Sequence, residues 1–94
     1  MTYDIRKEDG DTKGRFTVTV DGHEAELTYS RMSPHRIIAD HTGVPDALGG
    51  KGVGKALVEA LVADARATGT TVIALCPFVK AQAKRHPEWA DVFV

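Results

Sequence analysis

The clearest chemical signal in the sequence is a glycine-rich stretch, Leu48–Leu57, that leads directly into a predicted helix. Four of the six residues from 49 to 54 are glycine, which adopts positive φ angles easily and lets backbone N–H groups approach a ligand closely. The amphipathic pattern of Ala56–Thr68 predicts the helix. The N–H groups and the dipole at a helix N-terminus favour an anion, most often a phosphate. We therefore predict phosphate binding at this turn; the alternative is that the glycines only form a tight entry to the helix.

Two common nucleotide-binding motifs fit this stretch poorly. Gly49–Lys55 matches GxxxxGK, the start of a P-loop, but Ala56 replaces the Ser or Thr that must follow to hold Mg²⁺. A chain of 94 residues also has no room for the other parallel strands of a P-loop NTPase. The dinucleotide motif GxGxxG fails because Lys55 stands where its third glycine belongs. These departures argue against both nucleotide-binding classes.

Composition and charge narrow the remaining classes of protein. The length fits one domain, residues 1–94, with a single core. Twelve basic and 13 acidic residues give a net charge of −1, which does not indicate nucleic-acid binding. Because no apolar run of 18 residues and no signal-peptide pattern are present, we expect a cytoplasmic monomer that does not bind membranes. The single cysteine, Cys76, excludes an intramolecular disulfide, and the spacing of the histidines matches no metal site.

The pattern of apolar residues predicts an α/β (α+β) fold. Alternating and β-branched segments predict an antiparallel meander of about four strands: Tyr3–Lys7, Arg15–Val20, Glu24–Ser30 and His35–Thr42. Asp21–Gly22 is a hairpin dipeptide, and Gly69 is a suitable end for the first helix. Thr71–Leu75 is expected to lie parallel to the fourth strand because a crossover helix precedes it. A second helix is expected from Pro77 to about Arg85.

The glycine-rich stretch also resembles the coenzyme A loop of the GNAT (GCN5-related N-acetyltransferase) superfamily, Arg/Gln-x-x-Gly-x-Gly/Ala. Gly52-Val53-Gly54 matches the second half of that motif, whereas Gly49 stands where Arg or Gln is expected. The chain is similar to the very small GNAT-like proteins of about this length. That similarity rests on three further segments: His41–Pro45, Leu75–Val79 and Arg85–Trp89. The resemblance implies a minimal GNAT fold that binds acetyl-CoA.

The resemblance also implies where acetyl-CoA binds, namely in a V-shaped gap between two parallel strands, here His35–Thr42 and Thr71–Leu75. Its diphosphate is expected on the N–H groups of Gly50–Lys55, and its pantetheine along Thr42–Val44. The candidate cofactor-binding residues are Thr42, Gly43, Val44, Gly49, Gly50, Lys51, Gly52, Val53, Gly54, Lys55, Phe78, Lys80 and Lys84. Lys80 and Lys84 have two interpretations, contact with the 3′-phosphate of the cofactor or a solvated helix face.

Cys76 and His41 are the candidate catalytic residues. The resemblance places the thioester near Cys76, at the end of the second strand of the gap, where a following helix N-terminus would lower the thiol pKa. Cys76 is then an acetyl-accepting nucleophile or a proton donor to the departing CoA thiolate; the alternative is a small buried hydrophobe. His41 ends the neighbouring strand and is a candidate base for the incoming amine or for Cys76. Its alternative is a structural, hydrogen-bonded histidine.

These expectations together predict an acetyl-CoA-dependent N-acetyltransferase that acts on an unidentified amine. The resemblance implies an open acceptor side, because the chain lacks the helices that follow the first strand in longer GNAT enzymes. A non-catalytic acyl-CoA-binding or regulatory module is the main alternative. A second is an interaction domain in which the glycines are purely structural.

Overall fold

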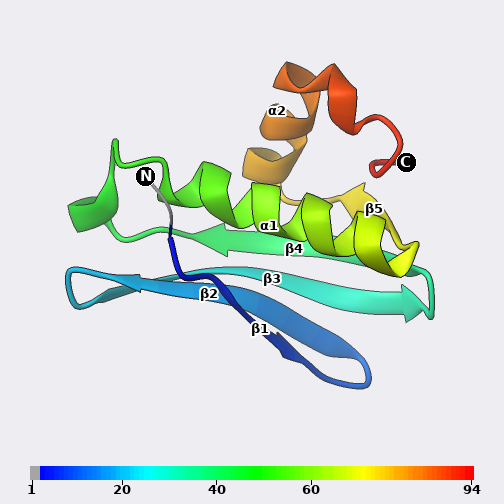
Figure 1. Cartoon of the computed structure of the whole chain (residues 1–94), viewed down its shortest axis with the longest axis horizontal. Coiled ribbons are helices and arrows are strands. Elements are labelled where there is room, and N and C mark those ends of the chain that lie inside the picture. Colours follow the sequence, from blue (N-terminus) through cyan, green and yellow to red (C-terminus); the bar gives the residue numbers. More distant parts are fainter. Residues whose placement is uncertain (1–2) are drawn as a thin grey trace.

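One five-stranded sheet organises the chain, with its strands in the order β1-β2-β3-β4-β5 (Figure 1). The computed structural model describes residues 3–94. The first four strands are antiparallel and β5 is parallel to β4, which confirms the predicted meander and crossover. Their bounds are β1 Arg6–Asp9, β2 Lys13–Val20, β3 His23–Ser33, β4 Arg36–Gly43 and β5 Thr71–Ala74.

The first strand lies further along the chain than the predicted Tyr3–Lys7. Pairing with β2 runs from Arg6, opposite Thr17, to Asp9, opposite Gly14. The pairing extends to Asp9 because the Gly10 N–H donates to the Lys13 carbonyl at 2.8 Å, so the turn closes beyond the strand. The turn between β1 and β2 therefore lies at residues 10–12.

Two helices and two short 3-10 segments complete the chain: η1 Asp46–Leu48, α1 Val53–Thr68, α2 Pro77–Arg85 and η2 Pro87–Trp89. α1 begins three residues before the predicted Ala56, because Gly52 serves as its N-cap and Gly54 is already helical. At the other end Gly69 adopts a left-handed φ of 66°, as its place in the sequence predicts. The Thr70 N–H then donates to the Ala65 carbonyl at 2.8 Å and closes the helix. Neither helix in the part of the chain that the structure describes is long and apolar enough to span a membrane.

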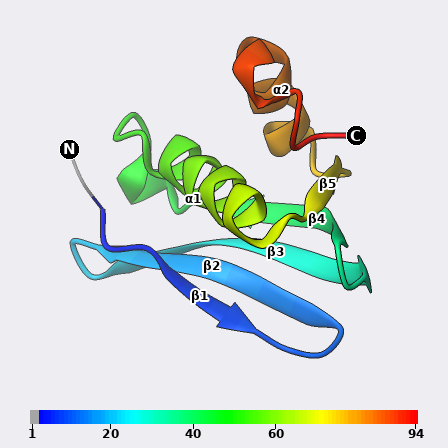
Figure 2. The same cartoon turned by 45° about the vertical axis from the view of Figure 1, so that its right-hand side comes forward.

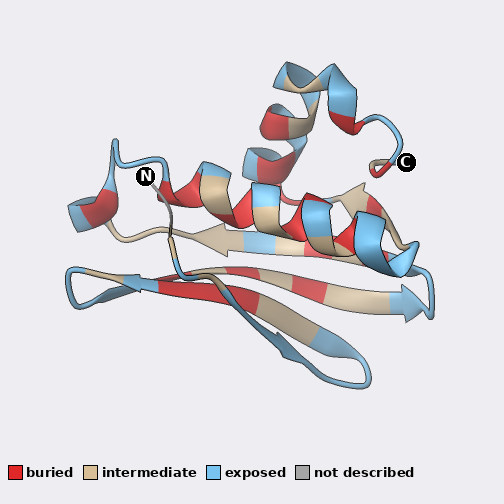
Figure 3. Ribbon diagram, viewed as in Figure 1, coloured by how far each residue is buried: buried red, intermediate tan, exposed pale blue. Residues whose placement is uncertain are grey.

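The core lies between α1 and one face of the sheet (Figures 2 and 3). Alternate residues of β2, β3 and β4 point into it and α1 covers them with its apolar stripe. These buried residues are Phe16, Val18, Ala25, Leu27, Tyr29, Ile37 and Ala39 from the sheet, and Val53, Leu57, Val58, Leu61, Val62 and Ala65 from α1. The residues between them in β2 and β3, such as Arg15, Glu24 and Glu26, face away from α1.

The C-terminal part of the chain packs against the β5 side of the molecule. α2 contacts β4, β5 and α1. The Val72 N–H donates to the Val92 carbonyl at 2.8 Å, and the Val94 N–H donates to the Val72 carbonyl at 3.0 Å. The last residues therefore cover part of the outer edge of β5, which would otherwise be open to another strand.

A β-bulge in β4 decides which of its side chains face the core. Tyr29 lies opposite Ala39, but the next residue of β3, Thr28, lies opposite His41, so Asp40 is an extra residue in β4. An extra residue reverses the alternation of all the following side chains. Thr42 consequently pairs with the buried Leu27 and faces the core side of the sheet.

Candidate functional site

The strands β4 and β5 separate beyond Ala39 and Ala74, the last residues they pair. The Ala39 carbonyl accepts two hydrogen bonds from the other strand, from Leu75 N–H at 3.2 Å and from Cys76 N–H at 2.9 Å. β5 then turns into α2, whereas β4 continues to Gly43. The end of β4 is thus left without a β5 partner, in the place where the resemblance predicts the V-shaped gap.

The glycine loop presents unpaired donors at the N-terminus of α1. Gly50 and Gly52 have φ angles of 74° and 71°, which residues with a Cβ rarely adopt. The first helical hydrogen bond runs from Ala56 N–H to the Gly52 carbonyl at 3.0 Å, so the N–H groups of residues 53–55 have no intrahelical partner. Gly52 has no side chain to cap them, and the first turn contains no acidic residue. The donors are therefore available to an anion.

The glycines of this loop have different structural roles. A Cβ on Gly50 or Gly52 would meet nothing within 4 Å, so only the backbone angle favours glycine there. Gly54 is constrained by packing instead, since a Cβ would lie 2.7 Å from Phe78 Cζ. The ring of Phe78 thus rests on the backbone of α1 and joins the N-termini of the two helices. Gly49 has an ordinary φ of −60°, and a Cβ there would lie 3.1 Å from the Asp46 carbonyl oxygen.

The thiol of Cys76 is buried, with 4% of the residue exposed, at the N-cap of α2. Its sulfur lies 3.5 Å from Thr42 Oγ1 on β4. Burial raises the pKa of the thiol, but the nearby Thr42 hydroxyl and the nearby backbone N–H groups of Val79, Phe78 and Thr42 favour the thiolate and lower the pKa by more. The net pKa is lower than that of an ordinary cysteine, which increases the fraction of reactive thiolate.

His41 does not contact the thiol, because the bulge at Asp40 turns it to the other face of the sheet. It pairs with Thr28 and is exposed. Its Nε2 atom would lie 3.4 Å from a Cβ on Gly43, with Glu26 on the same side. Thr42 therefore occupies the position beside Cys76 that the sequence suggested for His41. The exchange of orientation between His41 and Thr42 follows from the pairing of β3 with β4. The residue types alone do not indicate it.

The four candidate lysines differ in their partners. Lys51 Nζ lies 3.5 Å from the Asp21 carboxylate at the β2–β3 turn. Lys55, Lys80 and Lys84 are exposed, the first in the first turn of α1 and the others on α2.

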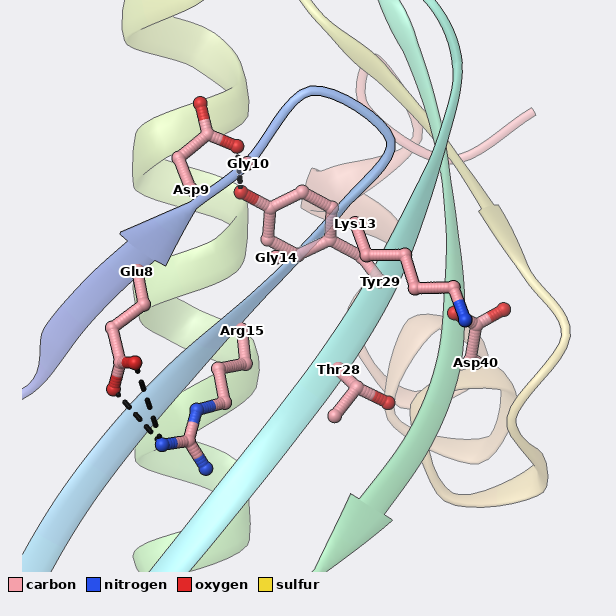
Figure 4. A pocket seen from close by; sticks show the side chains of 9 residues that line it. All are labelled: Glu8, Asp9, Gly10, Lys13, Gly14, Arg15, Thr28, Tyr29 and Asp40. Carbon is pink, nitrogen blue, oxygen red and sulfur yellow. Dashed lines mark hydrogen bonds and ion pairs between the residues drawn. The ribbon is translucent and has the colours of Figure 1, made fainter.

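Several hollows among the described residues border the face of the sheet that α1 leaves uncovered. One, of about 540 Å³, lies at the β1–β2 hairpin and contains none of the candidate residues. Figure 4 shows Arg15 directed toward Glu8 there and the Tyr29 hydroxyl directed toward Asp9. Another, of about 460 Å³, is lined by Arg15, Glu24, Glu26, Gly43, Val44 and Pro45. The end of β4 thus borders a charged hollow as well as the gap. Among residues 3–94 no group of three or more His, Cys, Asp or Glu side chains is placed to hold a metal ion.

Comparison with known proteins agrees with this geometry. The sequence profile of the family described as "GCN5-related N-acetyl-transferase" matches residues 15–92. Among solved structures, the chain is similar to a GCN5-like candidate N-acetyltransferase from Staphylococcus aureus, determined in solution by NMR. The two are 37% identical with a TM-score of 0.73, over 98% of this chain and 88% of the other. A comparison with curated proteins found no match. Because the family profile covers most of the sequence and the solved structure shares its minimal GNAT fold, the chain belongs to the GCN5-related N-acetyltransferase family.

Proposed function

We propose that the protein is an acetyl-CoA-dependent N-acetyltransferase in which Cys76 accepts the acetyl group before an amine does. The observation that carries the proposal is the surroundings of the sulfur. Thr42 Oγ1 lies 3.5 Å from it where β4 and β5 separate, and backbone N–H groups at the start of α2 lie near it, so the pKa of the thiol is lowered. Such donors stabilise a thiolate and hold it in place for attack on a thioester.

In the proposed reaction the Cys76 thiolate attacks the acetyl carbonyl carbon, and the bond from that carbon to the CoA sulfur breaks. The CoA thiolate leaves with the electron pair, and the acetyl group stays on Cys76 as a thioester. An acceptor amine then attacks this thioester, forms the amide and returns Cys76 to its thiolate. The proton of the amine passes to solvent water, because His41, the base that the sequence suggested, lies on the opposite face of the sheet from the thiol.

We propose that the acetyl donor binds along backbone groups that have no hydrogen-bond partner within the secondary structure. The diphosphate would lie on the N–H groups of Gly50–Lys55, where no side chain of residues 3–94 caps the helix. The pantetheine would follow Thr42–Val44, along the part of β4 that lacks a β5 partner. Phe78 would form a wall of the site, and Lys80 and Lys84 would face the 3′-phosphate. We place the reaction in the cytoplasm and assign it to a monomer.

The test is the intact mass of the protein after incubation with acetyl-CoA and an acid quench. The wild type is expected to gain one acetyl group without any acceptor, and Cys76→Ala is expected to gain none. Titration of Cys76→Ala with CoA is the control, because retained binding shows that the loss is chemical and not a failure to fold.

Two outcomes would contradict the proposal. If Cys76→Ala acetylated a peptide amine as fast as the wild type, the transfer would be direct. If the wild type bound acetyl-CoA but transferred nothing to itself or to a peptide amine, the protein would be a non-catalytic acyl-CoA-binding module.

A further inference from the structure

Lys51, in the middle of the glycine loop, is held from two sides by residues far away in the sequence. The Tyr3 hydroxyl donates a hydrogen bond to the Lys51 carbonyl oxygen at 2.5 Å. The Asp21 carboxylate lies 3.5 Å from the Lys51 ammonium group. These contacts bring the segment that precedes β1 and the β2–β3 turn to the loop that precedes α1. Both contacts come from residues outside the glycine loop.

The hydrogen bond from Tyr3 determines the direction of a neighbouring donor. The carbonyl of Lys51 and the N–H of Gly52 belong to one planar trans peptide, in which the two groups point in opposite directions. A hydroxyl that fixes the carbonyl therefore also fixes the N–H, which is directed away from Tyr3. Glycine at position 52 has no side chain to restrain this peptide plane, so an external restraint is effective here.

The ion pair between Lys51 and Asp21 is of a kind that can exchange for another partner. The two side chains are 46% and 72% exposed, and an exposed pair of this kind is weak and easily exchanged. Asp21 has a φ of 51° and is the one non-glycine residue with positive φ in the part of the chain that the structure describes. Aspartate is among the residues that adopt this angle, and Asp-Gly is a favoured pair at a hairpin turn. The charge of Asp21 has a partner in Lys51.

We propose that Tyr3 is a positioning residue of the diphosphate loop and that Asp21 is a stand-in anion, which a diphosphate oxygen displaces from Lys51. The inference rests on the proposed function, because it assumes that the loop binds the diphosphate of CoA. It extends the site to the N-terminal segment and to the β2–β3 turn. The recognition of the acetyl donor then depends on residues outside the glycine motif.

The experiment compares the affinity of the whole protein for CoA with its affinity for S-acetylpantetheine, which lacks the diphosphate. Tyr3→Phe is expected to weaken CoA binding about three- to tenfold, the effect of one hydrogen bond, and to leave S-acetylpantetheine binding unchanged. Tyr29→Phe is the matched control. It also loses a hydroxyl that hydrogen-bonds a protein oxygen, that of Asp9, but at the β1–β2 hairpin, and it should not change CoA affinity.

Asp21→Asn is expected to tighten CoA binding about two- to fivefold at low salt, because Lys51 no longer has a competing partner. In a Lys51→Ala background, Asp21→Asn should not increase the affinity for CoA. An equal gain in both backgrounds would show a general charge effect and would overturn the exchange of partners.

The positioning role of Tyr3 is overturned if Tyr3→Phe weakens both probes equally, or if it changes neither. If the wild type binds CoA and the variants bind it with the same affinity, this inference fails but the proposed function stands. If the wild type does not bind CoA at all, the proposed function fails and the inference fails with it.

Discussion

The two ends of α1 meet the rest of the molecule in opposite ways. At the C-terminal end, the Thr68 hydroxyl donates to the Asp64 carbonyl and Gly69 closes the helix. Arg66 makes two hydrogen bonds with the Asp91 carboxylate, at 2.9 and 3.0 Å. At the N-terminal end, among the residues that the structure describes, no side chain caps the helix and the first turn holds no acidic residue. The N-terminal end, where N–H groups lack intrahelical partners, is the end at which we propose that the diphosphate binds.

Replacing one glycine at each end tests this comparison most strongly. Gly52 and Gly69 have similar φ angles, 71° and 66°, and a Cβ on either would meet nothing within 4 Å. Changing either to Ala should destabilise the protein by about 1 kcal/mol through backbone strain alone. Gly52→Ala should also weaken CoA binding about tenfold, whereas Gly69→Ala should leave it unchanged. Urea unfolding and CoA titration measure the two effects, and equal losses of affinity would break the comparison.

An acidic residue in the first turn of α1 should move stability and binding in opposite directions. Lys55→Glu places a carboxylate at the third helical position, where it compensates the dipole and can cap the free N–H groups. The free energy of unfolding should rise by about 0.3–1 kcal/mol, while CoA affinity falls. Lys55→Gln is the control for loss of the lysine charge. If Lys55→Glu left CoA affinity unchanged, the first turn of α1 would not be the phosphate site.

Cys76 is the N-cap residue of α2, so a sulfur atom lies at the N-terminus of that helix, and Thr42→Val sharpens the contrast with α1. Loss of the hydroxyl should raise the pKa of Cys76, so alkylation of the thiol by iodoacetamide should need a higher pH. Thr28→Val, which removes a hydroxyl from the opposite face of the sheet, should leave the pH profile unchanged. An unaltered profile in Thr42→Val would exclude Thr42 as a donor to the thiolate.

The same pKa shift has a consequence for stability. Folding lowers the pKa of Cys76, so the unfolded chain binds its proton more tightly than the folded protein does. Stability should therefore rise with pH between the lowered pKa and the unfolded value of about 8.5. This contribution to stability should be lost as the pH falls through the pKa that Cys76 has in the folded protein. The rise in stability with pH should be smaller in Thr42→Val.

The smallest effect is expected at the partnered end of α1. Asp91→Asn weakens the pair with Arg66, which is exposed to solvent, and exposed pairs contribute little. A slightly lower urea midpoint with unchanged CoA affinity is expected. A clear loss of CoA affinity would show that the two ends of α1 are coupled.

Much of the fold could be predicted from local sequence patterns. Alternation gave the strands, Asp21–Gly22 the hairpin, Gly69 the end of α1 and Pro77 the start of α2. The glycine loop was found because glycine is needed locally at Gly50 and Gly52, where φ is positive. These features depend on residues close together in the chain, which is why a single sequence contains them.

Two of the missed features depend on contacts between distant segments. The bulge at Asp40 arises from the pairing of β4 with β3 and exchanges the orientations of His41 and Thr42. The hydrogen bond from Tyr3 to Lys51 joins residues 48 positions apart. Local patterns carry no information about either.

The contact of Phe78 with Gly54 has a consequence for attempts to change the acyl group of the proposed reaction. The ring leaves no room for a side chain at position 54, and it lies two residues after Cys76. Trimming Phe78 to make space for a longer acyl chain would also remove the spacer between α2 and the diphosphate loop. Engineering of chain-length selectivity should therefore compensate at position 54, by filling with Ala the space that a smaller residue at position 78 leaves.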